Sequence, residues 1–459
     1  MWQSDNVASA HAGWRIGSTL LQDRDDCGAG MGLLNYGWSN TMTIGSSYDY
    51  SAVRAAELAA ASKQRADSTH STSSTDVQDG TRENGWRIGV LYSRTGVTAA
   101  TESEHFFGTV LAIEEVNAAG GVDGRLLDPV VYDPKSDPDE YRRLATRMLQ
   151  EDDVTVIFGC STSSSRKAVL PVIERNNALL WYCSIYEGFE YSPNVIYTGA
   201  VPNQNSMQLA AYLLRNHGRR FFLVGADYIY PRESNRIMRD MVEQHGGEIV
   251  EEVYLPSDAD PSALEAVVQE IKAVEPDVVF STLIGRGARA FYKLYREHGI
   301  DPAHIPIASL TMTEGETRMI GPELCGGHII SASYVNTLNN ESNKRFLDAW
   351  QARFGDQPAS MWSEMAYNQV HLFALALART RSLDTAKLVE AAREVEFDSP
   401  EGLLKIDPEN NHAILTPRIA VCRPNGAFDV VWEGRGPIKP DPYLTSYGFS
   451  EFWLDGEPA

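Results

Sequence analysis

Two stretches of this sequence, Phe158-Gly-Cys-Ser-Thr-Ser-Ser-Ser-Arg166 and Gly225-Ala-Asp-Tyr-Ile-Tyr-Pro-Arg-Glu-Ser-Asn235, decide its fold class. In each of them an apolar segment typical of a buried strand gives way to hydroxyl-bearing residues and then to a helical pattern. In open α/β sheets, ligands bind beyond the carboxyl ends of the strands, where helix N-termini leave backbone amides unpaired. Neither stretch contains a catalytic motif. The pair therefore predicts a pocket that holds a small polar molecule without transforming it.

Strand and helix patterns alternate on both sides of these stretches. Strands are predicted at 86–92, 126–132, 154–158, 178–182, 195–198, 221–225, 248–254, 278–281, 305–308 and 328–332, with helices such as 102–117 and 137–150 between them. This alternation predicts α/β sheets wound in parallel with right-handed crossovers. We expect two doubly wound lobes joined by a hinge, with residues 86–204 in the first lobe and 205–335 in the second.

Residues 336–459 are predicted to complete both lobes. Helical patterns cover 342–354, 360–378 and 384–395, and short strands follow at 403–406, 418–422 and 428–432. The prolines at 440 and 442 exclude a helix nearby, so an extended tail is expected there.

Residues 1–85 have a different composition from the rest of the chain. The run Ser68-Thr-His-Ser-Thr-Ser-Ser-Thr75 is polar and of low complexity, and we expect a largely disordered N-terminal extension. Asp5, His11 and Arg15 interrupt any apolar core of a secretory signal. The expected location is therefore cytoplasmic, with a periplasmic location as the alternative if a mature chain begins near residue 85.

Composition excludes several classes of function. A net charge of −22 over 459 residues disfavours direct nucleic-acid binding, and no apolar run reaches the roughly 20 residues of a membrane span. The five cysteines are widely spaced and lack the pairing typical of a metal site, so they are interpreted as free thiols. The common hydrolase, metalloprotease and nucleotide-binding motifs are absent. We therefore expect a protein that is not an enzyme and needs no cofactor or metal.

The candidate binding residues follow two strands of the first lobe and one strand of the second. They are Ser161 and Ser163 at the start of a helix, Tyr182, Ser184 and Ile185 after the next strand, and Tyr228 and Tyr230 in the second lobe. Hydroxyl groups can both donate to and accept from a neutral polar ligand. The alternative interpretations are helix capping by the serines and ordinary packing by the tyrosines. Pro231 is predicted at the first position of the helix after Tyr230, and Pro171 is predicted to kink or end the earlier helix.

Several segments together resemble one known group of proteins. Residues 117–125, 163–175, 186–193, 202–206 and 227–235 are similar to the amide-sensing negative regulators of aliphatic amidase operons. These regulators belong to the amide- and urea-binding group of the type I periplasmic binding proteins. The resemblance implies a two-lobed cleft that closes on a short aliphatic amide. It also implies that binding releases an antiterminator-type partner protein.

The resemblance places Ser163, Tyr182, Ser184, Tyr228 and Tyr230 on ligand-pocket positions. Two positions depart from the pattern, because Ser161 stands where the sensor has a tyrosine and Ile185 where it has a proline. A serine in place of an aromatic residue opens space. The implied ligand is therefore larger or more polar than acetamide.

Three functions remain as hypotheses. The first is a cytoplasmic amide sensor that regulates amidase expression through a protein partner. The second is the substrate-binding subunit of an ABC transporter for short-chain amides or urea, which acts with a membrane permease. The third is an amidase, which needs a nucleophile and a base that the sequence does not reveal. Self-association of the chain is left open.

Overall fold

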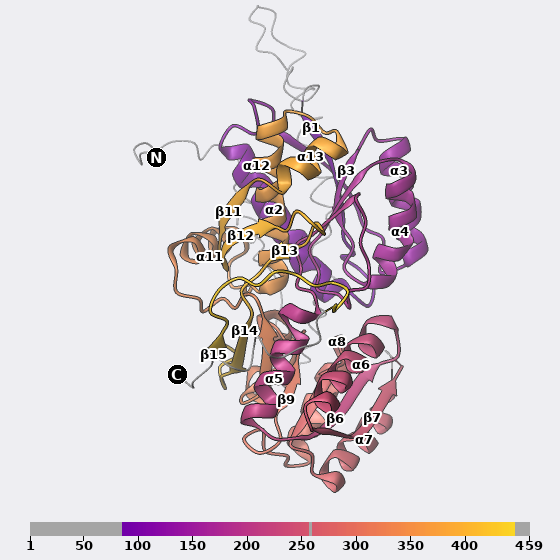
Figure 1. Cartoon of the computed structure of the whole chain (residues 1–459), viewed down its shortest axis with the longest axis vertical. Helices are drawn as coiled ribbons and strands as arrows, with labels where there is room; N and C mark the ends of the chain where they lie inside the picture. Colours follow the sequence, from indigo (N-terminus) through magenta and orange to yellow (C-terminus); the bar gives the residue numbers. More distant parts are fainter. Residues whose placement is uncertain (1–84, 257–258, 446–459) are drawn as a thin grey trace, which may run out of the picture. The chain divides into compact units, whose positions relative to one another are not determined.

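The computed structural model describes residues 85–256 and 259–445 (Figure 1). The predicted N-terminal extension therefore lies, apart from its last residue, outside the described residues, as does the end of the chain beyond residue 445. The described residues form two α/β lobes, each built on its own sheet.

The first lobe contains a five-stranded parallel sheet in the order β2-β1-β3-β4-β5. Its strands are β1 (Trp86–Leu91), β2 (Leu127–Tyr132), β3 (Val156–Gly159), β4 (Leu179–Tyr182) and β5 (Val195–Tyr197), and its connecting helices are α2 (Ala99–Ala118), α3 (Pro138–Gln150) and α4 (Ser163–Arg175). Each strand begins and ends within three residues of its predicted position, because the buried apolar runs are short and sharply bounded.

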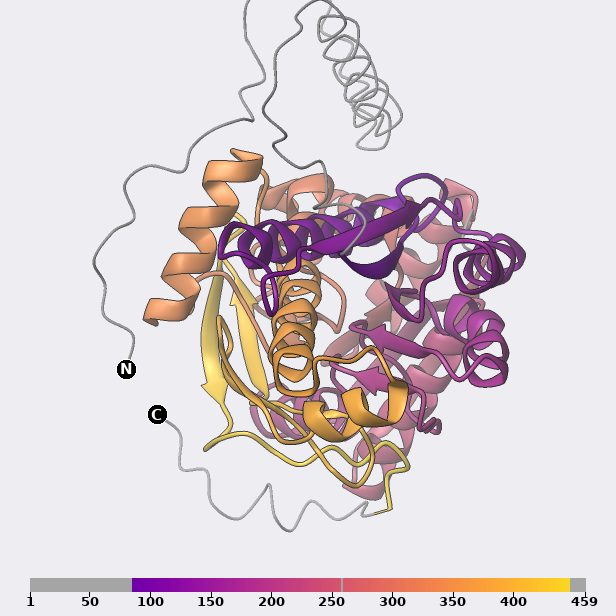
Figure 2. The ribbon, with the colours of Figure 1, turned by 90° about the horizontal axis from the view of Figure 1, so that it is seen from above.

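The two faces of this sheet are buried in different cores. Ile88 and Phe158 face one core, to which α2 contributes, while Leu91 and Ile157 face a second core with residues of α3 and α4. This alternation is the two-residue period of a strand buried on both sides. Helix α12 (Met361–Thr380) lies beside α2, as Figures 1 and 2 show.

The second lobe contains a seven-stranded sheet in the order β15-β14-β10-β9-β8-β6-β7. Its strands are β6 (Arg220–Ala226), β7 (Glu248–Leu255), β8 (Val278–Thr282), β9 (Ile307–Ser309), β10 (Ile329–Ala332), β14 (Arg418–Cys422) and β15 (Phe428–Glu433). Its helices are α5 (Ser206–Asn216), α6 (Ile229–Gln244), α7 (Pro261–Val274), α8 (Gly285–Glu297), α9 (Glu314–Ile320) and α10 (Pro322–Cys325). The strands from β7 to β10 pair in parallel, and β14 and β15 join antiparallel at one edge. The predicted α/β class with parallel sheets is confirmed.

The chain crosses between the lobes several times. After β10 it returns to the first lobe through α11 (Glu341–Phe354), α12, α13 (Thr385–Ala392) and the antiparallel strands β11 (Glu396–Ser399), β12 (Gly402–Ile406) and β13 (Ala413–Ile414). It then crosses again to β14. The segment after β15 turns back, where the Gln204 side chain donates to the carbonyl of Ile438 at 3.1 Å and to that of Ala413 at 2.9 Å. A short 3₁₀ helix (Pro202–Gln204) lies at the first crossing.

Pro171 does not end helix α4, which continues to Arg175; Pro171 lies on the exposed face, where water can solvate the carbonyl that loses its helical partner. The predicted start of the later helix at Pro231 was wrong. Helix α6 begins at Ile229 rather than at Pro231, with Tyr228 at its N-cap position. Tyr230 and Pro231 are therefore inside the first turn of the helix.

The close packing of α2 on α12 gives a prediction about stability. A methyl group on Gly108 of α2 would overlap the carbonyl of Ser363 on α12. We expect Gly108→Ala to lower the free energy of unfolding by about 1–3 kcal/mol, because the two helices must move apart. The matched control is Gly287→Ala on α8, where nothing lies within 4 Å of an added methyl group. The control is expected to keep or raise stability by up to about 1 kcal/mol. Equal stability of the two variants in urea unfolding would contradict the packing argument.

Candidate ligand-binding cleft

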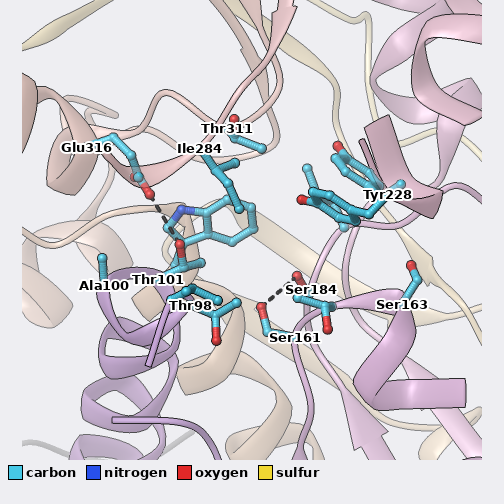
Figure 3. Close-up of a pocket in the computed structure, with 16 residues that line it drawn as sticks. Thr98, Ala100, Thr101, Ser161, Ser163, Ser184, Tyr228, Ile284, Thr311 and Glu316 are labelled. Carbon is cyan, nitrogen blue, oxygen red and sulfur yellow. Dashed lines mark hydrogen bonds between the residues drawn. The ribbon is translucent and has the colours of Figure 1, made fainter. Parts of the chain in front are cut away.

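A cavity of about 60 Å³ lies between the carboxyl ends of the parallel strands of the two sheets (Figure 3). Most of its lining follows strand ends: β1 and β3 lead to it in the first lobe, and β6 and β8 in the second. In both sheets these strands flank the point where the order of connections reverses, which is where open α/β sheets bind ligands. The lining residues that carry the argument are Thr101, Ser161, Ser163, Ser184, Tyr228 and Glu316.

The first wall of the cavity is the turn between β3 and α4. Cys160 holds this turn in the left-handed region with φ of 66°, and its amide donates to the carbonyl of Leu91 at 3.1 Å. Such a conformation is costly for a residue with a side chain and persists only where neighbours enforce it. Thr162 then caps α4 by accepting from the amide of Ser165 at 3.2 Å. The turn delivers the side chains of Ser161 and Ser163 to the cavity.

Behind this wall lies a buried network of charges centred on Arg166. Its guanidinium is inaccessible to solvent, pairs with Glu190 at 2.6 Å and with Glu187 at 3.6 Å, and lies 4.4 Å from the ring centre of Tyr186. Ser163 donates its hydroxyl hydrogen to Glu187. Burial lowers the pKa of Arg166, but Tyr182, Glu190 and Glu187 raise it more, so that the net pKa lies above its ordinary value. The network therefore holds a fixed positive charge under the wall, compensated by carboxylates.

The predicted residues after β4 occupy different places. Ser184 and Ile185 line the cavity, and the Ser184 hydroxyl lies 3.5 Å from that of Ser161, as Figure 3 shows. Tyr182 is not among the lining residues. It is fully buried behind the turn, and its hydroxyl donates to the carbonyl of Ser161 at 2.6 Å. The structure thus gives Tyr182 a supporting position, since β4 ends at Tyr182 and the strand alternation does not extend to Ser184.

Tyr228 and Tyr230 form part of the opposite wall, in the second lobe. They come from the start of α6, and burial raises the pKa of both phenols above the ordinary value. Both therefore stay neutral at physiological pH, with hydroxyl groups that can donate and accept. Of the seven residues predicted for the site, six line the same cavity.

The lining residues that sequence reasoning missed include three from distant segments. Trp362 lies in the first turn of α12, Thr101 lies in the first turn of α2, and Glu316 lies in α9. Thr101 donates to Glu316 at 3.2 Å across the two lobes (Figure 3). Glu316 follows β9 by seven residues, so its place after a strand was a usable signal. Nothing in the local pattern of Trp362 indicated a cleft.

Carboxylates gather where the two lobes meet near Glu316. Glu104 of α2 and Glu314 of α9 are both close to it; Glu314 and Glu316 are buried, and Glu104 is half-buried. Burial raises the pKa of each of them, and for Glu314 it does so to about 7. His105, which follows Glu104 in the sequence, is buried against Tyr92 and Trp362, and burial lowers its pKa to about 3, so it is neutral and adds no compensating charge.

Within residues 85–256 and 259–445, no group of three or more His, Cys, Asp or Glu side chains could hold a metal ion. None of the helices in these two ranges combines the length and the apolar character that a membrane span requires.

The family described as "Periplasmic binding protein domain" has a sequence profile that matches residues 86–448. The chain belongs to this family. The family predicted from the sequence is thereby confirmed at the level of type I periplasmic binding proteins, while membership in the amide-sensing group stays a prediction.

Three similar proteins share 20–25% of their aligned residues with this chain. The Leu/Ile/Val-binding protein homolog 6 of Brucella melitensis is 25% identical over 330 residues, which cover 67% of this chain and 83% of the relative. A Pseudomonas aeruginosa protein named for binding leucine, isoleucine, valine, threonine and alanine is 24% identical over 69% of this chain and 84% of its own length. The solved structure of an ABC transporter solute-binding protein from Rhodopseudomonas palustris in complex with p-hydroxybenzoic acid has a TM-score of 0.72, with 20% identity, and covers 80% of this chain and all of that chain.

The buried carboxylates predict a dependence of stability on pH. The pKa of Glu314 is higher in the folded state than in the unfolded state, so folding takes up a proton between about pH 4.5 and 7. Its contribution to stability is fully present below about pH 4.5 and is lost as the pH rises through 7. We compare the free energy of unfolding of Glu314→Gln with that of the parent at each pH. This difference should favour the variant more at pH 8 than at pH 5, by up to about 3 kcal/mol, since each pKa unit is worth about 1.4 kcal/mol.

Urea unfolding at both pH values measures this difference. Glu323→Gln on α10, an exposed carboxylate close by, is the control and should show no such pH-dependent gain. A Glu314→Gln variant whose stability runs parallel to that of the parent from pH 5 to pH 8 would contradict the assignment.

Proposed function

We propose that this protein is the solute-binding component of an ABC-type importer and that its solute is a small neutral amide. The observation that carries the proposal is the cavity between the lobes, whose polar lining consists mainly of hydroxyl groups with no lysine, arginine or histidine. An uncharged amide offers one acceptor and an NH₂ donor, and hydroxyls can satisfy both without a buried charge. A cleft made by two lobes can close on such a ligand and thereby present a different surface to a permease.

The relatives favour the importer role over the regulator predicted from the sequence. Those named above are binding proteins for small solutes, and one of the solved structures is called an ABC transporter protein. Membership in the periplasmic family likewise supports a periplasmic location over a cytoplasmic one. The sensor role that acts through an antiterminator has no such support.

The size of the cavity supports a short ligand. A buried water needs about 10–15 Å³ of the same kind of volume, so about 60 Å³ accommodates roughly four to six non-hydrogen atoms. Urea and the shortest amides are of this size, whereas leucine and hydroxybenzoate are larger. The added room expected from Ser161 is therefore modest in this conformation, because Trp362 and Ile185 also line the cavity.

A small amino acid is the second candidate, and Glu316 is the observation that favours it. Glu316 is the acidic side chain in the lining, and a carboxylate can hold an ammonium group. The start of α4 could hold the amino acid carboxylate with backbone amides. The names of the Brucella and Pseudomonas relatives, as amino acid-binding proteins, agree with this alternative.

A ligand screen by thermal unfolding tests the proposal. Acetamide, propionamide, butyramide, formamide and urea are compared with alanine, leucine and p-hydroxybenzoate. We expect at least one amide or urea to stabilise the protein, by about 2.7 kcal/mol when its concentration is 100 times Kd. The amide proposal would be contradicted if the amino acids or the aromatic acid stabilised the protein and neither the amides nor urea did.

Glu316→Gln separates the two candidates by titration calorimetry. If the ligand is a neutral amide, the substitution keeps a hydrogen-bonding group and should change Kd by less than about tenfold. If the ligand carries an ammonium group, loss of its buried partner should cost about 2–5 kcal/mol, which is a rise in Kd of at least about thirtyfold. Glu297→Gln on the surface of α8, where the carboxylate lies 3.7 Å from Lys293, is the matched control for loss of one negative charge.

A further inference from the structure

We infer that Glu187, a residue outside the cavity lining, selects the ligand by fixing the direction of the Ser163 hydroxyl group. This inference deepens the proposed function, on which it rests, by specifying the group that a ligand must present at Ser163. A ligand with an N–H donor at this point is accepted, and a carboxylate is rejected.

The hydrogen-bonding capacity of Ser163 is nearly used up within the protein. A hydroxyl group has one hydrogen to donate and two lone pairs that accept. Ser163 donates its hydrogen to Oε2 of Glu187, and Nη1 of Arg166 donates to the Ser163 oxygen at 3.4 Å. One lone pair therefore remains for the cavity. Towards a ligand, Ser163 is an acceptor only.

This polarity is enforced because Glu187 cannot turn away. Its side chain is only 4% exposed, and its other oxygen, Oε1, lies 3.6 Å from Nη2 of the fully buried Arg166. Arg166 is in turn fixed by Glu190 at 2.6 Å and by the rings of Tyr182 and Tyr186 at 4.7 and 4.4 Å. A hydroxyl group on the protein surface could rotate to suit a ligand, whereas this one is locked by a buried ion pair.

The part of the opposite side around Glu316 has the same polarity. Glu316 accepts from Thr101 at 3.2 Å and from Thr313 at 2.6 Å, so these two hydroxyl hydrogens are directed to Glu316 rather than to a ligand. A ligand carboxylate would face the lone pair of Ser163 on one side and the Glu316 carboxylate on the other. A carboxamide can turn its NH₂ group to Ser163 and its carbonyl to the remaining hydroxyls.

The test compares each amide with the acid of the same shape. The pairs are acetamide and acetate, isobutyramide and isobutyrate, leucinamide and leucine, and p-hydroxybenzamide and p-hydroxybenzoate. Titration calorimetry of the full chain at pH 7 gives Kd for both members. Within every pair that binds, we expect the amide to bind at least about thirtyfold more tightly than the acid, because the acid leaves an acceptor facing an acceptor.

Glu187→Gln should weaken this preference. A glutamine can donate its own N–H to Ser163 and so free the hydroxyl hydrogen to point at the ligand. We expect the amide-to-acid ratio to fall by about tenfold or more. The matched control is Glu174→Gln, since the Glu174 carboxylate accepts from the hydroxyl of another serine, Ser192, at 2.8 Å, and its ratio should stay that of the parent.

Ser163→Ala covers the case in which Glu187→Gln does not fold. The alanine variant keeps the ion pair and removes the acceptor, so the preference for the amide should again fall by about tenfold. Thermal unfolding without ligand checks that each variant is folded.

The possible results separate the two proposals. A parent protein that binds the acid of any pair as tightly as its amide overturns the inference and leaves the role as a solute-binding protein intact. An amide preference that persists unchanged in folded Glu187→Gln or in Ser163→Ala also overturns it. Binding of no member of the four pairs counts against the proposed function and the inference together.

Discussion

The arrangement of the cleft depends on one buried cation. Arg166 has no contact with solvent, and an unpaired guanidinium in such a place would cost several kcal/mol. Glu187 and Glu190 compensate its charge, and its guanidinium carbon lies over the rings of Tyr182 and Tyr186. Through Ser163 and the carbonyl of Ser161, the same network fixes the turn that begins α4. A cavity lined mainly by hydroxyl groups can therefore rest directly on a layer of strong charges.

The two walls of the cavity therefore differ in how rigidly they are held. The turn of the first lobe is held by charged groups and by a left-handed residue at Cys160, so it can change little when a ligand binds. The opposite wall comes from the first turn of α6 and from α9, which touch the first lobe through contacts such as that between Thr101 and Glu316. Adjustment to a ligand therefore falls mainly on the second lobe and on the distance between the lobes.

The sequence predicts the architecture well, because the information for it is local. The strand that follows residue 154 and the one that follows residue 220 are short apolar runs closed by small polar residues, and their alternation with helices leaves few topologies. Six of the seven predicted residues line one cavity for the same reason, since parallel strands end at a common edge. Trp362 and Tyr182 could not be placed this way. Their positions depend on contacts between segments far apart in the chain, and the end of β4 decides which side chain faces the cleft.

The repeated crossings of the chain at the hinge limit how the protein can move. Four connecting segments of the chain join the lobes: one after β5, one after β10, one before β14 and one after β15. Gln204 ties three of them together through the carbonyls of Ala413 and Ile438. Several connections side by side restrict sliding and twisting of two lobes more than they restrict opening about the hinge. A ligand that bridges the lobes would therefore act on the motion that these connections leave least restricted.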